Sequence, residues 1–364
     1  MESSSIDTNL PLVFIHGIKG SLLCRKSTKK LVFLKACQVF NINQTFLCSC
    51  DAEDDHFALP LKWNENDQRL NVQETDDIEA PKPIDTLKLF GFPIKTVYGP
   101  FLQFGEDSNR PFYPFAYDWR RENSEAVSKF AEFVRSIHDK HKSKVQIVAH
   151  SMGGMITMGL LHDHSDLIHS ILFAGTPFGA GVPYLEDLTN GSVLGLNTTL
   201  LSPSVLFSFP ASFSFFPVSE QDAIDNNSSF KDPSGNHFYV DLYDSNEWIK
   251  HKLSIFGGPV SDTTVQYLQK ALDSAKSFRE RYMIFNKEIR YPPIAVLAGD
   301  AIPTKNYILL TRTDSETKLD FNILDKPPGD GRIIVPNCMP PKGIPHRAYT
   351  VCVPIFASLL LMRA

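Results

Sequence analysis

The chain has 364 residues, a formal net charge of −5 at pH 7 and 43% hydrophobic residues. Its length and apolar content predict a single globular domain over residues 1–364, large enough for a full core and for insertions. The small negative charge argues against a nucleic-acid-binding surface and gives no strong attraction to anionic membranes.

The first eight residues are polar and acidic, without the basic and apolar segments of a secretory leader. The longest apolar stretch, residues 351–362, contains Pro354 and is shorter than the ~20 residues of a membrane-spanning helix. We therefore expect a cytoplasmic or peripheral-membrane protein with free thiols and no transmembrane segment. A secreted or lumenal protein is the alternative if the N-terminal sequence is incomplete. Five Asn-x-Ser/Thr sequons favour that alternative: Asn43, Asn190, Asn197, Asn226 and Asn227.

Residues 11–15, Pro-Leu-Val-Phe-Ile, are typical of a buried strand, and residues 16–20, His-Gly-Ile-Lys-Gly, predict a tight turn after it. Next, residues 24–96 mix cysteines, acidic runs and Trp63 with little periodicity. We interpret this region as a lid-like insertion.

An amphipathic helix is predicted before the centre of the chain. Val127, Phe130, Val134 and Ile137 recur at helical spacing, and Asn123 or Ser124 can cap the start. This apolar face is expected to pack into the core.

The most informative segment is Ala-His-Ser-Met-Gly at residues 149–153, between an apolar β-branched run at 145–148 and an apolar helical pattern from Met152. A serine at such a strand-to-helix turn is a nucleophile elbow, held in a strained conformation with its hydroxyl exposed. Ser151 is thus the expected nucleophile of acyl transfer. The backbone N–H of Met152 is the first expected oxyanion donor, and that of Ile18, or second Lys19, is the other.

Strand patterns at 168–174 and 294–299 continue an alternation of strands and helices, which predicts an α/β-hydrolase fold with a mostly parallel central sheet. Residues 182–266 interrupt this alternation and are expected to form a cap insertion. The segment 205–217 within it carries five phenylalanines. These rings either line an acyl-chain tunnel and a bilayer-touching surface or pack the small core of the cap itself.

The acid and the histidine of a triad should follow the serine along the chain. His346 lies in a Pro/Gly-rich loop before an apolar stretch, residues 349–362, that we expect to form a closing helix. Asp330 and Asp300 are the candidate acids, because both follow strands. The expected nucleophile and general base are Ser151 and His346, and the expected acid is Asp330 or Asp300.

Several sequence blocks together indicate a family. They lie at residues 15–22, 117–120, 149–153, 174–181, 302–304, 329–331 and 343–346. On these blocks the chain resembles the lecithin:cholesterol acyltransferase family, which includes lysosomal-type phospholipases A. The resemblance implies Asp330 as the acid, in a late Gly-Asp element, with Asp300 as the alternative, and Ile18 as the second oxyanion donor.

His16 and Ala149 depart from the proline and glycine common in that family. We interpret Asp118 and Arg120 as a buried structural pair.

The resemblance implies a glycerophospholipid as acyl donor, met at a membrane or lipid-particle surface. Water as acceptor gives a phospholipase, whereas a sterol or lipid hydroxyl gives an O-acyltransferase. A carboxylesterase or triacylglycerol lipase is the nearer alternative, and an inactive lipid-binding protein is the more distant one. The chemistry requires no cofactor and no metal, and we expect no nucleic-acid partner.

Overall fold

The computed structural model describes residues 9–35, 38–39, 77–89, 92–312 and 317–352. Its centre is a six-stranded sheet in which every neighbouring pair of strands is parallel. This confirms the predicted α/β-hydrolase fold class. The strands, in spatial order, are β17 (Arg347–Val351), β12 (Ile294–Gly299), β9 (Ile168–Ala174), β8 (Val145–His150), β1 (Leu12–Ile15) and β7 (Phe112–Phe115).

Helices cover both faces of the sheet, which explains why β1 is apolar at every position. Successive residues of a strand point to opposite faces. Leu12 and Phe14 pack with α2 (Gly99–Asp107) in one apolar cluster. Val13 and Ile15 belong to the larger cluster, together with α3 (Asn123–His141) and α4 (Met152–His164).

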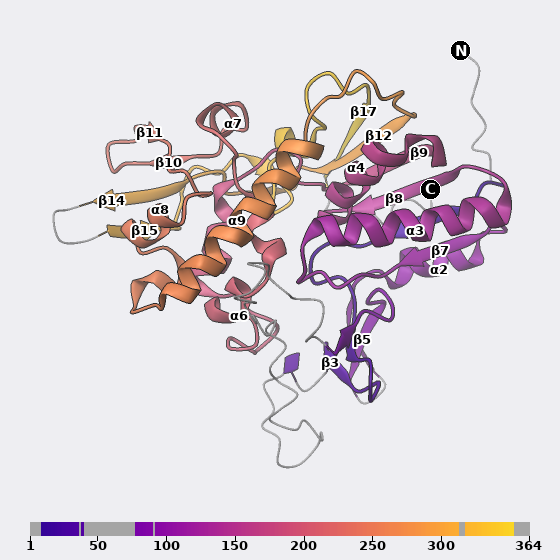
Figure 1. The fold of residues 1–364 in the computed structure, drawn as a ribbon, viewed down its shortest axis with the longest axis horizontal. Coiled ribbons are helices and arrows are strands. Elements are labelled where there is room, and N and C mark those ends of the chain that lie inside the picture. The colour runs from indigo at the N-terminus through magenta and orange to yellow at the C-terminus, as the bar shows by residue number, and fades with distance from the viewer. Residues whose placement is uncertain (1–8, 36–37, 40–76, 90–91, 313–316, 353–364) are drawn as a thin grey trace.

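Residues 182–266, which the sequence predicts as a cap, form short elements beside the long helix α9 (Asp262–Tyr282), and α9 runs between these elements and the helices of the sheet (Figure 1). The phenylalanines of segment 205–217 are all below 9% exposed, and their rings contact Trp119, Trp248 and Tyr267. They therefore pack the inside of the cap. Its other helices are α5 (Leu185–Asn190), α6 (Pro203–Phe207), α7 (Glu220–Asp225) and α8 (Ser245–Lys250). Strands β10 (Phe230–Lys231), β11 (His237–Phe238), β14 (Ile308–Arg312) and β15 (Thr317–Asp320) form a four-stranded sheet beside them.

The expected lid-like insertion is described only in part. Cys37, Cys48, Cys50 and Trp63 lie outside the described residues. The described part holds β2 (Leu23–Arg25), β3 (Leu31–Phe33), β4 (Ile78–Glu79), β5 (Thr86–Leu89) and β6 (Phe92–Thr96), which form small antiparallel sheets. Among the described residues, Cys24, Cys338 and Cys352 are free thiols.

Two predicted elements need correction. Residues 349–351 were expected to begin a closing helix, but they form the end of β17 because their backbone pairs with β12. Residues 353–364 of that expected helix lie outside the described part. The N-cap of α3 is Glu122, since Asn123 is already helical and buried. Within the described residues, no helix has the length and apolar character needed to cross a membrane.

Candidate active site

Ser151 occupies the turn between β8 and α4 and has φ 52° and ψ −127°. A non-glycine residue with positive φ is strained, and such strain is typical of functional sites. The turn is tight because α4 starts directly against β1: a Cβ on Gly153 would lie 2.4 Å from the His16 carbonyl oxygen. The expected nucleophile elbow is therefore present in its backbone geometry.

The glycine turn after β1 passes directly over the serine. A Cβ built on Gly17 would lie 2.7 Å from Ser151 Cβ and 3.1 Å from Ser151 Oγ. Ile18 follows Gly17, and in the described part of the chain no acceptor takes the Ile18 N–H. The Met152 N–H opens α4, where helical N–H groups have no acceptor within the helix. The two expected oxyanion donors therefore lie on backbone segments that meet at Ser151.

Two buried histidines flank this junction, and the sequence patterns did not single them out. The His16 ring stacks on Tyr117 at a centroid distance of 4.4 Å, and the His150 ring accepts or donates at Tyr98 Oη over 2.8 Å. Burial lowers the pKa of His16 to about 3 and that of His150 to about 4. Both rings are therefore neutral at pH 7.

Both candidate acids lie at the carboxyl edge of the sheet, as Ser151 does. Asp300 follows β12, and its Oδ1 is a buried atom without a hydrogen-bond partner in the described region. Asp330 follows β16 (Pro328–Gly329), which pairs with β13 (Ile302–Pro303) just beyond β12. The N–H groups of Arg332 and Ile333 both donate to Asp330 Oδ1 over 2.8 Å. Burial nevertheless raises the pKa of the Asp330 carboxyl.

The structure does not bring His346 to Ser151, which corrects the expected triad geometry. In the sheet register, Tyr349 of β17 pairs with Leu297 of β12. Leu297 pairs with Ala174 of β9, and Ala174 pairs with His150 of β8, so Tyr349 and His150 lie at the same level. His346 precedes β17, so it lies toward the amino edge, roughly 14 Å across and roughly 13 Å along the strands from Ser151. Its Nδ1 is 2.8 Å from the Ile344 carbonyl oxygen. Among the described residues, no hydrogen bond joins Ser151, Asp330 and His346.

The Asp118–Arg120 pair is the buried anchor that the sequence predicted. Arg120 is fully buried, and its Nη2 and Nε donate to the two carboxylate oxygens of Asp118 at 2.5 and 2.8 Å. Trp119 between them donates its indole N–H to the Ser21 carbonyl over 3.3 Å. This block therefore supports the segment that follows the oxyanion loop.

An ion network joins the oxyanion loop, the cap and the acid loop. Asp187 of α5 accepts two bonds from Arg332, at 2.7 and 3.1 Å, and lies 3.6 Å from Lys19 Nζ. Burial lowers the pKa of Lys19 to about 8 although Asp187 opposes the shift. Because Lys19 follows Ile18 and Arg332 lies two residues after Asp330, the network links α5 to both of these loops.

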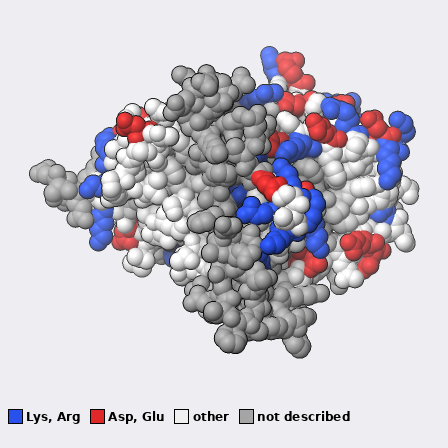
Figure 2. Space-filling view, turned by 60° about the horizontal axis from the view of Figure 1, so that its bottom comes forward, with Lys and Arg blue, Asp and Glu red and all other residues white. Residues whose placement is uncertain are grey.

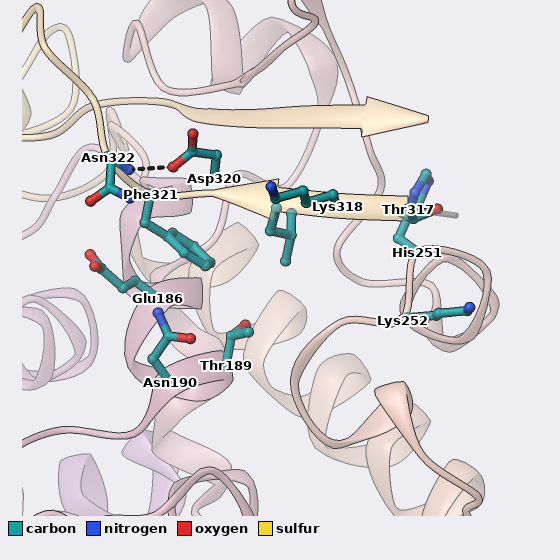
Figure 3. A pocket seen from close by; sticks show the side chains of 11 residues that line it. Glu186, Thr189, Asn190, His251, Lys252, Thr317, Lys318, Asp320, Phe321 and Asn322 are labelled. Atoms are coloured by element: carbon teal, nitrogen blue, oxygen red, sulfur yellow. Dashed lines mark hydrogen bonds between the residues drawn. The ribbon is translucent and has the colours of Figure 1, made fainter. Parts of the chain in front are cut away.

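A cavity of about 490 Å³ lies elsewhere, between the cap and β15, and contains none of the expected catalytic residues. Figure 3 shows Thr189 and Asn190 on its α5 side and Phe321 on the opposite side. Both acidic and basic side chains line it, among them Glu186, Lys252, Lys318 and Asp320. Because none of the expected catalytic residues lines this cavity, it is distinct from the site at Ser151.

The surface near β2 and β3 carries charges of both signs. In Figure 2, lysine and arginine side chains gather around acidic ones on the side of the molecule that lies at the bottom of Figure 1. Lys29 of the β2–β3 hairpin pairs with Glu79 at 2.7 Å, and Asp77 accepts from the Ser27 N–H. The described part of this surface is therefore partly compensated in charge.

Comparison with known proteins identifies the family. The sequence profile of the family described as lecithin:cholesterol acyltransferase matches residues 82–318, which is more than half of the chain. The chain belongs to the lecithin:cholesterol acyltransferase family. This match confirms the resemblance found in the sequence. Ser151 lies within the matched residues, whereas Ile18, Asp330 and His346 lie outside them.

Individual proteins are similar to parts or all of this chain. The uncharacterized protein YJR098C of Saccharomyces cerevisiae is 26% identical over 176 residues, covering 46% of this chain and 26% of that protein. The chain thus matches about a quarter of that relative's length. A chain of the Tle4–Tli4 complex is 12% identical with a TM-score of 0.61 and covers 96% of this chain and 97% of its own. The mature Bacillus licheniformis lipase BlEst2 is 11% identical with a TM-score of 0.39, covering 99% and 94%.

Proposed function

We propose that this lecithin:cholesterol acyltransferase family member cleaves or transfers a fatty acyl group from a glycerophospholipid through an acyl-enzyme on Ser151. The observation that carries the proposal is the strained Ser151 turn crossed by the Gly17–Ile18 loop at van der Waals distance. A serine beside two convergent backbone N–H groups suits attack on an ester carbonyl.

In the proposed reaction, Ser151 Oγ forms a bond to the ester carbonyl carbon. The N–H groups of Met152 and Ile18 donate to the oxyanion that develops on the carbonyl oxygen. The carbon–oxygen bond to the lysolipid then breaks, the lysolipid oxygen takes up the proton that Ser151 Oγ lost, and Ser151 keeps the acyl group. Water releases a fatty acid, whereas a sterol or lipid hydroxyl releases a new ester. The surrounding cap would govern the choice by controlling access of water.

The proposal assigns the acid role to Asp330, whose carboxyl lies at the same sheet edge as Ser151. His346 was the expected general base, but it does not act on Ser151 from its observed position near the amino edge. Base catalysis by His346 would require the segment around β17 to move relative to β8.

The displaced His346 also favours a second candidate, a protein that holds an acyl lipid at Ser151 without turnover. The two candidates differ in products. Purified protein and its Ser151→Ala variant would be incubated with mixed phosphatidylcholine and cholesterol vesicles, and products read by mass spectrometry. Serine-dependent lysophospholipid with fatty acid or sterol ester supports the enzyme. Bound lipid without serine-dependent product supports the second candidate, and cleavage of glycerides or short esters alone supports a neutral-ester hydrolase.

A further inference from the structure

We infer that Tyr98 is a positioning residue for the oxyanion hole, because its hydroxyl ties the loop that carries Ile18 to the strand that carries Ser151. The inference rests on the proposed acyl-transfer function, to which it adds a residue with a defined role. Tyr98 lies at the N-terminus of α2, more than 50 residues before the serine, and is 1% exposed.

The Tyr98 hydroxyl makes two hydrogen bonds at this junction. The Gly17 N–H donates to Tyr98 Oη over 3.1 Å, and Tyr98 Oη lies 2.8 Å from His150 Nδ1. The rings of Tyr98 and His150 meet edge to face with centroids 5.6 Å apart. Gly17 precedes Ile18, and His150 precedes Ser151, so one oxygen atom contacts the backbone of the residue before Ile18 and the side chain of the residue before Ser151.

The chemistry of the groups fixes the direction of the first bond. An amide N–H can only donate, so the phenol oxygen accepts from Gly17. Burial lowers the pKa of His150 to about 4, so its ring is neutral at pH 7 and carries one proton. The tautomer of His150 decides whether Tyr98 Oη donates to Nδ1 or accepts from it, and in both cases the hydroxyl joins Gly17 to His150.

Hydrogen bonds hold both ends of the loop. At the end beside the serine, the Gly17 carbonyl, which shares its peptide group with the Ile18 N–H, accepts from the Gly20 N–H over 3.1 Å and lies 2.8 Å from His16 Nδ1. The Ile84 N–H donates to the Gly20 carbonyl over 2.9 Å, and the Tyr98 N–H donates to the Ile84 carbonyl over 3.2 Å. Tyr98 therefore anchors both ends of the loop, through residue 84 at Gly20 and through its own hydroxyl at Gly17. The Tyr98 hydroxyl bond acts next to Ile18 and connects this end of the loop to His150.

Loss of the Tyr98 hydroxyl should leave the Ile18 N–H in place but hold it less firmly in position. Deleting one oxyanion donor typically costs ~10²–10³-fold in kcat. Displacing Ile18 by loosening Gly17 should therefore lower kcat by roughly 10- to 100-fold. KM should change less than threefold, because the contact strengthens in the transition state and not in the ground state.

The test is Tyr98→Phe compared with Tyr113→Phe. Tyr113 on β7 is a matched control, because its hydroxyl also lies between a histidine, His141 at 2.7 Å, and an N–H donor, Lys140 at 3.1 Å. Ester hydrolysis is measured as kcat and KM, and amide hydrogen exchange is measured on the peptide that contains Gly17 and Ile18. We expect the kcat loss and at least tenfold faster exchange in Tyr98→Phe only.

Unchanged exchange at Gly17 and Ile18 in folded Tyr98→Phe overturns the inference, as does equal loss of kcat in both variants. The exchange measurement does not need turnover. If the wild-type protein cleaves no ester, the proposed function fails. Faster amide exchange in Tyr98→Phe would still support the role of the Tyr98 hydroxyl in holding the Gly17–Ile18 segment. A rise in KM without a fall in kcat also overturns the positioning role.

Discussion

Gly17 and Ser151 are in direct contact across the junction of β1 and β8, close enough that any side chain at position 17 would overlap the serine. This contact places the oxyanion loop over the nucleophile. Both residues belong to turns at the carboxyl edge of the parallel sheet, where this class of fold places its reacting groups. The geometry of the site therefore depends on the close packing of these two backbone turns more than on charged side chains.

Gly17→Ala should strongly lower the rate of ester turnover. A Cβ there would lie 2.7 Å from Ser151 Cβ, so the loop must move and the Ile18 N–H must leave its position. We expect a fall in kcat/KM of at least about 100-fold, as for the loss of an oxyanion donor. Gly257→Ala is the control, because a Cβ at Gly257 meets nothing within 4 Å. Retained activity in Gly17→Ala would show that the loop is not fixed over the serine.

Asp118→Asn should destabilise the fold strongly. Arg120 is fully buried, and removing the charge of its partner leaves an uncompensated cation, which costs about 3–5 kcal/mol. Urea unfolding followed by circular dichroism measures this loss. Lys29→Met, which breaks the exposed pair with Glu79, should leave the urea midpoint unchanged. A small effect at Asp118 would mean that water reaches Arg120.

Stability should fall as the pH drops from about 6.5 to about 4. The pKa values of His16 and His150 are about 3 and about 4 in the folded chain, whereas unfolded histidine titrates near 6.5. Below pH 6.5 the unfolded state binds more protons, so the free energy of unfolding decreases by about 1.4 kcal/mol per pH unit for each histidine. Urea unfolding at pH 7, 6 and 5 measures the slope, and His150→Gln should reduce it. An unchanged slope in that variant would contradict a neutral buried His150.

His346→Ala should alter ester hydrolysis less than about threefold. His346 lies toward the amino edge of the sheet, away from Ser151, so its removal takes no proton acceptor from the observed site. Steady-state kinetics across pH 5–9 measure the effect. A loss near 1000-fold with the fold intact would instead show that the segment around β17 moves to bring His346 to the serine.

Local patterns were sufficient to predict the elbow and the strands around it. The apolar run at 145–148, the small residues around Ser151 and the glycine turn after β1 each act over a few residues, so the sequence reveals them. The Phe-rich segment left two interpretations open, because burial depends on Trp248 and Tyr267, which are distant in sequence.

The position of His346 could not be predicted in this way. Residues 349–351 are apolar enough for a helix or a strand, and only their pairing with β12 shows that His346 lies before a strand rather than after one. That difference moves a residue from one edge of a parallel sheet to the other. The Gly17–Tyr98 bond joins residues 81 positions apart, and no spacing in the sequence indicates it.

The most direct test of the central claim is covalent labelling of Ser151 by a long-chain alkyl fluorophosphonate, followed by peptide mass spectrometry. The account predicts a single adduct on Ser151, slowed by prior incubation with phosphatidylcholine vesicles and absent in Ser151→Ala. A folded wild-type protein that binds the vesicles but forms no adduct at Ser151 would contradict the assignment of this serine as the nucleophile.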